Sequence, residues 1–350
     1  MGKTYYRPLG ICYGPDAEQL IAQRRAGSLG GGAAIAFTMV ESVKRVGAEI
    51  SREIIPYAEV RDADPIQAIE VSRGHFGGVA MDQPRIMGIV NVTPDSFSDG
   101  GQHGTAQAGS AHGLRLAAEG AHILDVGGES TRPGSDAVSL DEELARVIPA
   151  AAALHAAGHV VSIDTRKAQV MRDAARAGAS IINDVSALQH DPDSLGTVAE
   201  LGLPVVLMHA QGDPRTMQLN PHYQDVCLDV YDHLESRIAA CVAAGISRTN
   251  IAIDPGIGFG KTFHHNLDLL NHITLFHGLG VVVLLGLSRK SLVGALTGEK
   301  VAGNRINGSV GGAVQAALNG IHILRVHDVK ATAEALAVAM GVASPGTTEF

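Results

Sequence analysis

The stretch IMGIVNVTPDSFSDGG, residues 86–101, joins an apolar, β-branched run to a polar segment. The apolar run ends at Asn91, and Asp95, Ser96 and Asp99 follow before two glycines. This order predicts a buried strand that opens into a polar loop, as in barrels and doubly wound sheets, where loops carry the functional side chains. A strand followed by an ordinary solvated loop would have the same sequence pattern. Recurrence of the pattern along the chain is therefore needed to favour a functional loop.

The pattern recurs seven more times. The eight apolar runs span residues 86–91, 122–127, 159–164, 180–184, 204–209, 251–254, 282–287 and 321–326. Helical patterns rich in Ala and Leu follow them, at residues 106–118, 140–157, 168–177, 194–200, 223–244, 263–270, 311–319 and 330–340. Alternating strands and helices predict a parallel sheet, and eight repeats predict an α/β fold of the (β/α)8 or TIM-barrel type. An open doubly wound sheet is the alternative, but it usually has an early Gly-rich dinucleotide turn, which this sequence lacks.

Residues 1–82 differ from the rest of the chain. Gly27 and residues 30–32 form a turn-prone patch, and residues 34–43 read as a strand or a short helix. No Lys-Ser or Lys-Thr pair follows the patch, as a phosphate-binding loop would require. We expect an N-terminal extension of unknown function over residues 1–82 and a barrel domain over residues 83–345.

Composition excludes several classes of protein. The chain has 350 residues, 45% of them hydrophobic, and a formal net charge of −9, which argues against sequence-independent binding of nucleic acid. Its three cysteines form no CxxC pair, which indicates a reducing compartment. The N-terminal residues lack the apolar core of a signal peptide, and no run is long enough for a membrane helix. We therefore expect a cytoplasmic protein without a membrane partner.

In a TIM barrel the functional side chains lie at the carboxyl ends of the strands. The predicted strand ends and the turns after them carry Asn91, Asp125, Asp164, Asn183, His209, Asp254, Ser288, Arg289, Lys290, Arg325 and His327. One polar residue at a strand end is common. Eight polar strand ends in phase, dominated by Asp, Asn, Lys, Arg and His, predict a functional site at one mouth of the barrel.

The residue types suggest two halves of a site. Asp164, Asn183 and Asp254 suit a ligand edge rich in N–H donors, such as a guanidine-like heterocycle, because carboxylates accept strong charge-assisted bonds. The same three oxygen-bearing residues could instead bind a divalent metal. Lys290, with Arg325 and His327 beyond it, supplies cations beside the last two strands, which is the frequent phosphate-binding quarter of a barrel. For His327, the alternative to anion binding is a purely structural role.

Two further loops stand out. The segment IAIDPGIGFGKT, residues 251–262, fails the P-loop pattern, because the required first glycine falls on Pro255. We expect its glycines to let the backbone approach a flat ligand beside Phe259. The segment GGESTRPGS, residues 127–135, could close over the site together with the loop after Asn91.

Taken together, the motifs resemble those of the dihydropteroate synthase family. The matching runs, which occur in that family's order between Arg85 and about Val342, are NVTPDSFSDGG, ILDVGGESTRPGS, SIDT, INDVS, HxxGxPxxMQ, DPGIGFGK, SRKS and RVHD. Residues 1–82 lie outside the resemblance, so no function is transferred to them.

The resemblance implies a (β/α)8 barrel that condenses 6-hydroxymethyl-7,8-dihydropterin pyrophosphate with p-aminobenzoate to give 7,8-dihydropteroate and pyrophosphate, with Mg²⁺. It implies pterin binding by Asp164, Asn183, Met208, Asp254, Phe259, Gly286, Lys290 and Arg325; pyrophosphate binding by Asn91, Arg325 and His327; Mg²⁺ binding by Asn91; and p-aminobenzoate binding by Thr131, Arg132, Pro133 and Ser291. The residues it implies for catalysis are Asp99, Lys290, Arg325 and His327.

A mechanism fits these roles. The aromatic amine is a weak nucleophile and pyrophosphate is a good leaving group, so we expect the C–O bond to break early and leave a pterin-methyl cation. Mg²⁺, Arg325 and His327 would stabilise the departing charge, while Asp99 would face the cation. No strong general base is required.

Two other functions share this pattern. A methyltransferase that passes a methyl group from a folate to a corrinoid would use the same acidic pocket, but it would not need Arg325 and His327 as an anion site. A non-catalytic paralogue would be expected to lack a pocket residue, and none is missing. The resemblance also implies a homodimer and competition by sulfonamides, which resemble p-aminobenzoate.

Overall fold

The structure is a computed structural model, and it describes residues 2–32, 34–92, 102–130, 138–212 and 216–345. Eight strands form a closed barrel in the order β10-β11-β12-β13-β14-β7-β8-β9, and every pairing around it is parallel. The strands are β7 (Arg85–Asn91), β8 (Ile123–Gly127), β9 (Val161–Asp164), β10 (Ile181–Asp184), β11 (Val205–Met208), β12 (Ile251–Asp254), β13 (Val282–Leu285) and β14 (Ile323–Val326). The predicted TIM barrel is confirmed.

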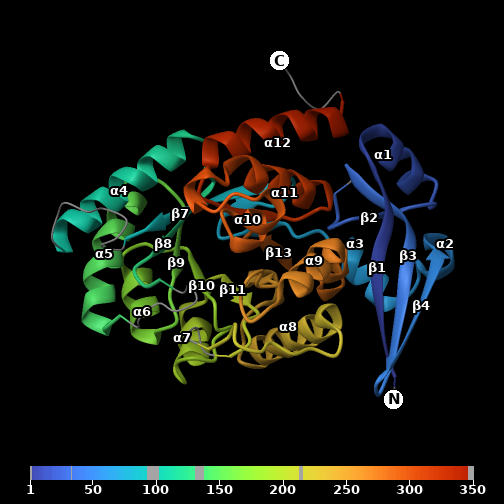
Figure 1. Cartoon of the computed structure of the whole chain (residues 1–350), viewed down its shortest axis with the longest axis horizontal. Helices are drawn as coiled ribbons and strands as arrows, with labels where there is room; N and C mark the ends of the chain where they lie inside the picture. The colour runs from blue at the N-terminus through green and yellow to red at the C-terminus, as the bar shows by residue number, and fades with distance from the viewer. Residues whose placement is uncertain (1, 33, 93–101, 131–137, 213–215, 346–350) are drawn as a thin grey trace.

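Helices cover the outside of the barrel (Figure 1). They are α4 (Gln102–Ala118), α5 (Leu140–Ala156), α6 (Ala168–Arg176), α7 (Ser194–Leu201), α8 (Val226–Ala243), α9 (Phe263–Asn271), α10 (Ser291–Thr297), α11 (Ile306–Leu318) and α12 (Val329–Ala343). Short 3₁₀ turns lie at η2 (Arg248–Asn250), η3 (Ile273–Leu279) and η4 (Ala302–Asn304). The sequence pattern missed α10 and began α11 at residue 311 rather than 306, because the glycines in both helices lower the local helix propensity.

The inner wall of the barrel explains the position of the site. Side chains alternate along a strand, so every second residue faces the barrel axis. A buried apolar layer contains Ile123, Ile181, Val206, Ala252, Leu284 and Ile323. Two residues farther along each of these strands or its continuation come, in the same order, Asp125, Asn183, Met208, Asp254, Gly286 and Arg325. The apolar layer therefore supports a mostly polar layer at the carboxyl ends of the strands.

A small hairpin closes the opposite end of the barrel. It consists of β5 (His75–Phe76) and β6 (Val79–Ala80), which pair with each other. Phe76 and Met81 are buried within the apolar layer of the barrel interior. The end of the barrel without the polar layer is thus filled by residues of the N-terminal extension.

The rest of the extension is an antiparallel sheet with short helices, seen at the right of Figure 1. Its elements are β1 (Lys3–Tyr13), α1 (Gly14–Ala22), β2 (Gly27–Ser28), β3 (Ile35–Val46), β4 (Glu49–Pro56), α2 (Tyr57–Val60) and α3 (Asp64–Glu70). β3 pairs with β1, β2 and β4. The stretch that read as a strand or a helix is therefore a strand.

Charged side chains join this sheet to the barrel helix α8. Arg45 Nη1 donates to Asp229 Oδ1 at 2.7 Å, and Arg52 Nη2 donates to Asp225 Oδ2 at 2.6 Å. The Tyr5 hydroxyl donates to Asp232 Oδ2 at 2.8 Å, and its ring packs edge-on against Tyr231 in the main core. Basic residues of the sheet thus face an acidic row on α8.

This interface gives a first prediction. Arg45 and Asp229 are each about three-quarters buried in the interface, with 21% and 24% of the side chains exposed. Arg45→Ala, Asp229→Ala and the double variant should give a coupling energy of about 1 kcal/mol in urea unfolding. Arg25, which is exposed on the same extension, provides the control substitution. Additive effects of the two single substitutions would show that the pair contributes nothing.

Within the described part of the chain, no helix has both the length and the apolar character that a membrane crossing requires.

Candidate active site

Arg325 lies at the centre of the polar layer. It comes from β14, and its guanidinium donates from Nε to Asp125 Oδ2 at 2.6 Å and from Nη2 to Asp164 Oδ2 at 2.7 Å. Asn183 Nδ2 donates to the same Asp125 oxygen at 3.1 Å. One cation therefore holds two carboxylates from two neighbouring strands, and an amide from a third strand joins them.

Asp125 is a site residue to which the sequence analysis gave no role, although it was noted as a strand end. Its side chain is fully buried, and its Oδ1 atom has no hydrogen-bond partner among the described residues. Buried polar atoms rarely lack a partner in folded proteins. Its position two residues after Ile123, in register with the other polar-layer residues, is the signal that would have assigned it to the site.

The polar residues at the mouth of the barrel form a ring around Arg325. The second half of this ring contains Asp254 and Lys290. Gly256 N donates to Asp254 Oδ1 at 2.7 Å. The second carboxylate oxygen, Oδ2, does not take part in this bond. A methyl group at Gly286 would lie 3.8 Å from Asp254 Oδ2, 3.8 Å from Lys290 Nζ and 3.9 Å from Arg325 Cβ. The absence of a side chain at this glycine leaves open the space where the acid and the two cations converge, and that space suits a flat ligand.

Lys290 is fixed from two sides. Its ammonium group donates to the carbonyl oxygen of Ile257 and lies 4.8 Å from the centroid of the Phe259 ring. Burial lowers the pKa of Lys290 to about 8, even though nearby Asp254 opposes the shift. The lysine can therefore change charge near neutral pH.

The pKa values of the acidic residues are shifted upward. Burial raises the pKa of Asp164 to about 7; Arg325 opposes this shift and the neighbouring Asp125 adds to it. Burial also raises the pKa of Asp254, against the opposing effect of Lys290. Burial would lower the pKa of Arg325, but its acidic neighbours raise it overall, so the guanidinium stays charged. Perturbed groups gathered at one mouth are typical of a functional site.

His327 and Asn91 lie at the rim. His327 follows β14, and its Nδ1 atom lies 3.0 Å from the hydroxyl of Ser288, which also accepts from the backbone N–H of His327 at 3.2 Å. Asn91 ends β7, the strand next to β14. Ser288, which the sequence analysis noted only as part of a turn, therefore orients the histidine.

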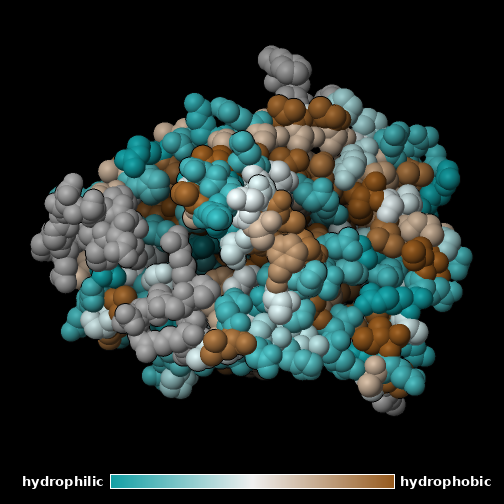
Figure 2. All heavy atoms as spheres, in the orientation of Figure 1, coloured by the Kyte–Doolittle hydropathy of each residue, from teal (hydrophilic) through white to brown (hydrophobic). Residues whose placement is uncertain are grey.

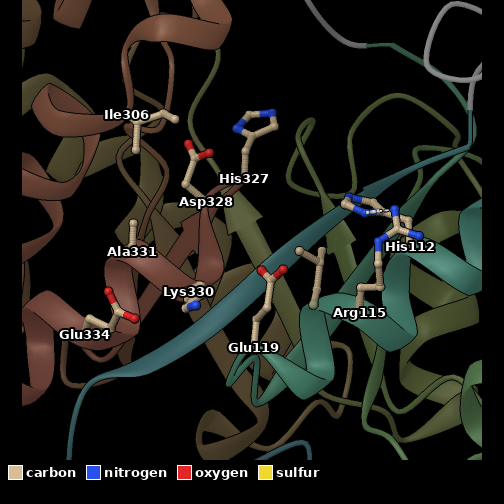
Figure 3. A pocket seen from close by; sticks show the side chains of 10 residues that line it. His112, Arg115, Glu119, Ile306, His327, Asp328, Lys330, Ala331 and Glu334 are labelled. Atoms are coloured by element: carbon tan, nitrogen blue, oxygen red, sulfur yellow. Dashed lines mark hydrogen bonds between the residues drawn. The ribbon is translucent and has the colours of Figure 1, made fainter.

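A cavity of about 380 Å³ opens beside this rim, between α4 and α12. Figure 3 shows His327 on one side of it and His112 with Arg115 on the other. The cavity lies outside the ring formed around Arg325. The sequence pattern indicated His327 but not the cavity, because most of the other lining residues come from the helices α4 and α12.

The remaining predicted site residues lie outside this group of contacts. Asp99, Thr131, Arg132 and Pro133 lie outside the described residues. Met208 is buried at the end of β11, in the polar layer. Ser291 is exposed as the first residue of α10, directly after Lys290.

The lysine of the GFGKT run is the second residue that the sequence analysis left without a role. Lys261 is 3% exposed, and its ammonium group contacts Gly256 O at 2.9 Å, Phe259 O at 3.0 Å, His209 O at 3.2 Å and His209 Nδ1 at 2.8 Å. The ammonium group of Lys261 therefore bonds to its own loop and to the neighbouring His209. This agrees with the rejection of a P-loop, in which the lysine reaches a phosphate.

The fold and these polar side chains define a TIM barrel whose mouth suits a flat ligand edge rich in N–H donors. In agreement, the family model described as "Pterin binding enzyme" matches residues 87–327. The dihydropteroate synthase of Escherichia coli K12 is 48% identical over 264 residues, which is 75% of this chain and 93% of the relative. The dihydropteroate synthase of Neisseria meningitidis serogroup C is 50% identical over 263 residues, which is 74% of this chain and 92% of the relative.

Solved structures agree. That of Xanthomonas albilineans dihydropteroate synthase with 4-aminobenzoic acid has a TM-score of 0.72 and 53% sequence identity, over 75% of this chain and 94% of the other. The chain belongs to the dihydropteroate synthase family and is a transferase. Both the resemblance drawn from its motifs and the expected enzyme class are confirmed.

Proposed function

We propose that this chain condenses 6-hydroxymethyl-7,8-dihydropterin pyrophosphate with p-aminobenzoate at the mouth formed by β8, β9, β10, β12, β13 and β14. The observation that carries the proposal is that Asp254, Lys290 and Arg325 meet at the space beside Gly286. Arg325 in turn holds Asp125 and Asp164, and Asn183 bonds to Asp125. Relatives support it, since a structure of the Xanthomonas albilineans enzyme is described as a complex with 7,8-dihydropteroate.

The pterin would lie flat over Gly286. Its aminopyrimidinone edge carries N–H donors, and Asp254 Oδ2 is the acceptor that Gly256 leaves unused. Lys290 would donate to an acceptor atom of the ring, and the guanidinium of Arg325 would face the ring plane. Each charge-assisted hydrogen bond contributes about 1.5–3 kcal/mol net.

The reaction replaces one bond. The C–O bond between the pterin methylene carbon and pyrophosphate breaks, and the oxygen keeps the electron pair. The amine nitrogen of p-aminobenzoate then bonds to that carbon and releases one proton. Arg325 and His327 would stabilise the departing negative charge, and such preorganised electrostatic stabilisation is usually the largest contribution to catalysis.

Mg²⁺ fits the rim only together with the substrate. Among the described residues, no three His, Cys, Asp or Glu side chains are grouped to hold a metal, and Asn91 offers a single amide oxygen. Mg²⁺ commonly keeps several waters and uses substrate phosphates with one or two protein ligands. Asn91 would hold the ion beside the pyrophosphate, and the ion would supply neutralisation of the diphosphate charge.

The experiment is an assay of the full chain with both substrates and Mg²⁺, in which release of pyrophosphate and formation of 7,8-dihydropteroate are measured. Formation of both products in equal amounts supports the proposal. Binding of the pterin without turnover would favour the non-catalytic paralogue, and methyl transfer to a corrinoid would favour the methyltransferase. A sulfonamide should compete with p-aminobenzoate, as suggested by the Yersinia pestis enzyme, whose structure is described with a sulfonamide drug complex.

Lys290 predicts how activity depends on pH. Because burial lowers its pKa to about 8, the ammonium form is present below that pH and is lost above it. We expect kcat/KM for the pterin substrate to fall about tenfold per pH unit above pH ~8. Lys290→Arg, whose guanidinium stays charged, should lack this basic limb, whereas a wild-type profile that stays flat to pH ~10 would contradict the assignment.

The assembly and the compartment are also proposals. We propose a homodimer, supported by a hydrophobic patch over α12 in Figure 2, where Val338 and Val342 are 68% and 77% exposed. Light scattering of the eluted protein would test it, because a monomer mass would refute it. We also propose a cytoplasmic location, supported by three cysteines that are all free thiols. Fractionation of cells that express the chain would test this.

A further inference from the structure

The β12–α9 loop, residues 255–262, is folded around the ammonium group of its own Lys261. The Nζ atom of this lysine donates to the carbonyl oxygen of Gly256 at 2.9 Å and to that of Phe259 at 3.0 Å. The same atom donates to the carbonyl oxygen of His209, which follows β11, at 3.2 Å, and it lies 2.8 Å from His209 Nδ1. One buried side chain therefore joins two points of the loop to the end of the neighbouring strand.

The backbone of the loop packs closely against the segment after β11. Gly256 and Gly260 have φ angles of +71° and +62°, a conformation that favours glycine. A methyl group at Gly256 would lie 1.9 Å from the carbonyl oxygen of His209, and one at Gly260 would lie 2.4 Å from that of Gln211. The loop therefore has a tight, specific shape in which its inward carbonyl groups receive their hydrogen bonds from Lys261.

The same loop supports Lys290 at the site. The carbonyl oxygen of Ile257 accepts from Lys290 Nζ, and the centroid of the Phe259 ring lies 4.8 Å from that atom. A methyl group at Gly258 would lie 3.5 Å from Lys290 Cδ. These three supporting residues are consecutive, and they lie directly after Gly256, the first loop residue that Lys261 binds. The shape that Lys261 gives the loop therefore sets the position of Lys290.

Charge also connects the two lysines. Asp254 and Arg325 are the charged groups that act on Lys290: the acid raises its pKa and the guanidinium lowers it, while burial is the largest effect and lowers it. Burial also lowers the pKa of Lys261 well below its usual range; Asp254 opposes this shift and Lys290 adds to it. A change at Lys261 should therefore be detectable at Lys290.

We propose that Lys261 is a positioning residue for the pterin half of the site, and that it acts by holding the β12–α9 loop in the shape that places Lys290 and Phe259 beside Asp254. Lys261 itself is buried beneath its own contacts and touches no ligand. The inference rests on the proposed function for the identity of the ligand, whereas the placement of Lys290 can be measured without any substrate.

Replacement of Lys261 by methionine shows how the positioning works. Lys261→Met keeps the length of the side chain but leaves the carbonyl oxygens of Gly256, Phe259 and His209 without their donor. Buried polar groups that lack a partner are costly, so the loop should open until water reaches them. Lys290 would then lose its acceptor on Ile257 and part of its burial, and its pKa should rise toward the ordinary value of a lysine.

The test measures the pKa of Lys290 directly in the full chain without substrate. Lysines are labelled with a small acylating reagent at a series of pH values, and mass spectrometry of the peptide that contains Lys290 gives the midpoint. Burial lowers this pKa to about 8 in the wild type. In Lys261→Met we expect the midpoint to rise by about one pH unit. Lys261→Gln, which keeps two N–H donors, should shift it less, and it replaces the methionine variant should that variant fail to fold.

Steady-state kinetics provide the second readout. We expect KM for the pterin substrate to rise about tenfold in Lys261→Met, and the basic limb of kcat/KM to move upward together with the labelling midpoint. Val170→Ala, at a buried position on α6, is the control for a general loss of stability. Lys44→Met, at an exposed lysine on β3, is the control for the substitution itself.

The outcomes separate this inference from the proposed function. A midpoint for Lys290 that stays within about 0.3 pH unit of wild type in Lys261→Met, or that moves equally in Val170→Ala, would overturn the inference, whether or not the wild-type chain turns over. A wild-type chain without turnover would refute the proposed function. A shifted midpoint in that case would still support the placement of Lys290 by Lys261.

Discussion

Arg325→Met is expected to abolish measurable turnover and to destabilise the fold. Arg325 is the shared partner of Asp125 and Asp164, and both carboxylates are buried. Removal of one partner from a buried ion pair costs about 3–5 kcal/mol, because the remaining charge is left uncompensated. We expect the free energy of unfolding to fall by about this amount, and turnover to fall at least about 10³-fold, since the departing pyrophosphate also loses its cation.

Two matched variants separate the two effects. Arg325→Met combined with Asp125→Asn removes one of the orphaned charges, so it should recover part of the stability but none of the turnover. Arg325→Lys keeps a charge but lacks the planar fork that reaches Asp125 and Asp164 in two directions, so it should be intermediate in both measurements. Urea unfolding and pyrophosphate release provide the readouts. A stable Arg325→Met variant with normal turnover would disprove the central role of this arginine.

Asp254→Asn is expected to lose affinity for the pterin without losing stability. An amide at this position would offer one oxygen and would direct an N–H group at the donors of the pterin edge. The charge-assisted bond to Oδ2 contributes about 1.5–3 kcal/mol, so we expect affinity to fall by about 10²-fold. Burial raises the pKa of Asp254, which means that its charge is already disfavoured in the fold, and removing the charge should leave the melting temperature unchanged or higher.

Isothermal titration calorimetry with the pterin substrate in the absence of p-aminobenzoate would measure this loss. Asp268→Asn, at an exposed carboxylate on α9, is the control for the substitution itself. Unchanged pterin affinity in Asp254→Asn would place the aminopyrimidinone edge elsewhere. A large drop in melting temperature would show that the carboxylate is structural.

The barrel could be predicted because its signal is local and repeated. Each apolar run is a strand of four to seven residues, and none of the predicted starts and ends of the eight strands differs from the structure by more than two residues. Parallel strands in a barrel end at the same mouth, so strand-end residues such as Asp164 and Lys290 had to be close to one another. The residue types then indicated that one half of the site binds a ligand edge rich in N–H donors and that the other half binds an anion.

Partners and spacing could not be predicted in the same way. Asp125 and Arg325 are 200 residues apart in the chain and bond only because β14 and β8 flank β7 in the closed barrel. Lys261 had no role assigned from the sequence, and the loop turns this lysine inward onto its own carbonyl groups. The filling of the other end of the barrel by Phe76 depends on packing in one cluster with residues of several barrel strands, which no local pattern reveals.

The sequence by itself determined the order of the eight barrel strands, the alternation that directs every second side chain inward, and the chemical types gathered at one mouth, because these follow from the periodicity of short segments. Only the tertiary structure decided that Arg325 joins Asp125 to Asp164, that Gly286 leaves the space between Asp254 and Lys290 open, and that Lys261 joins the β12–α9 loop to His209. Those contacts join residues distant in the chain, and the closure of the barrel sets their distances.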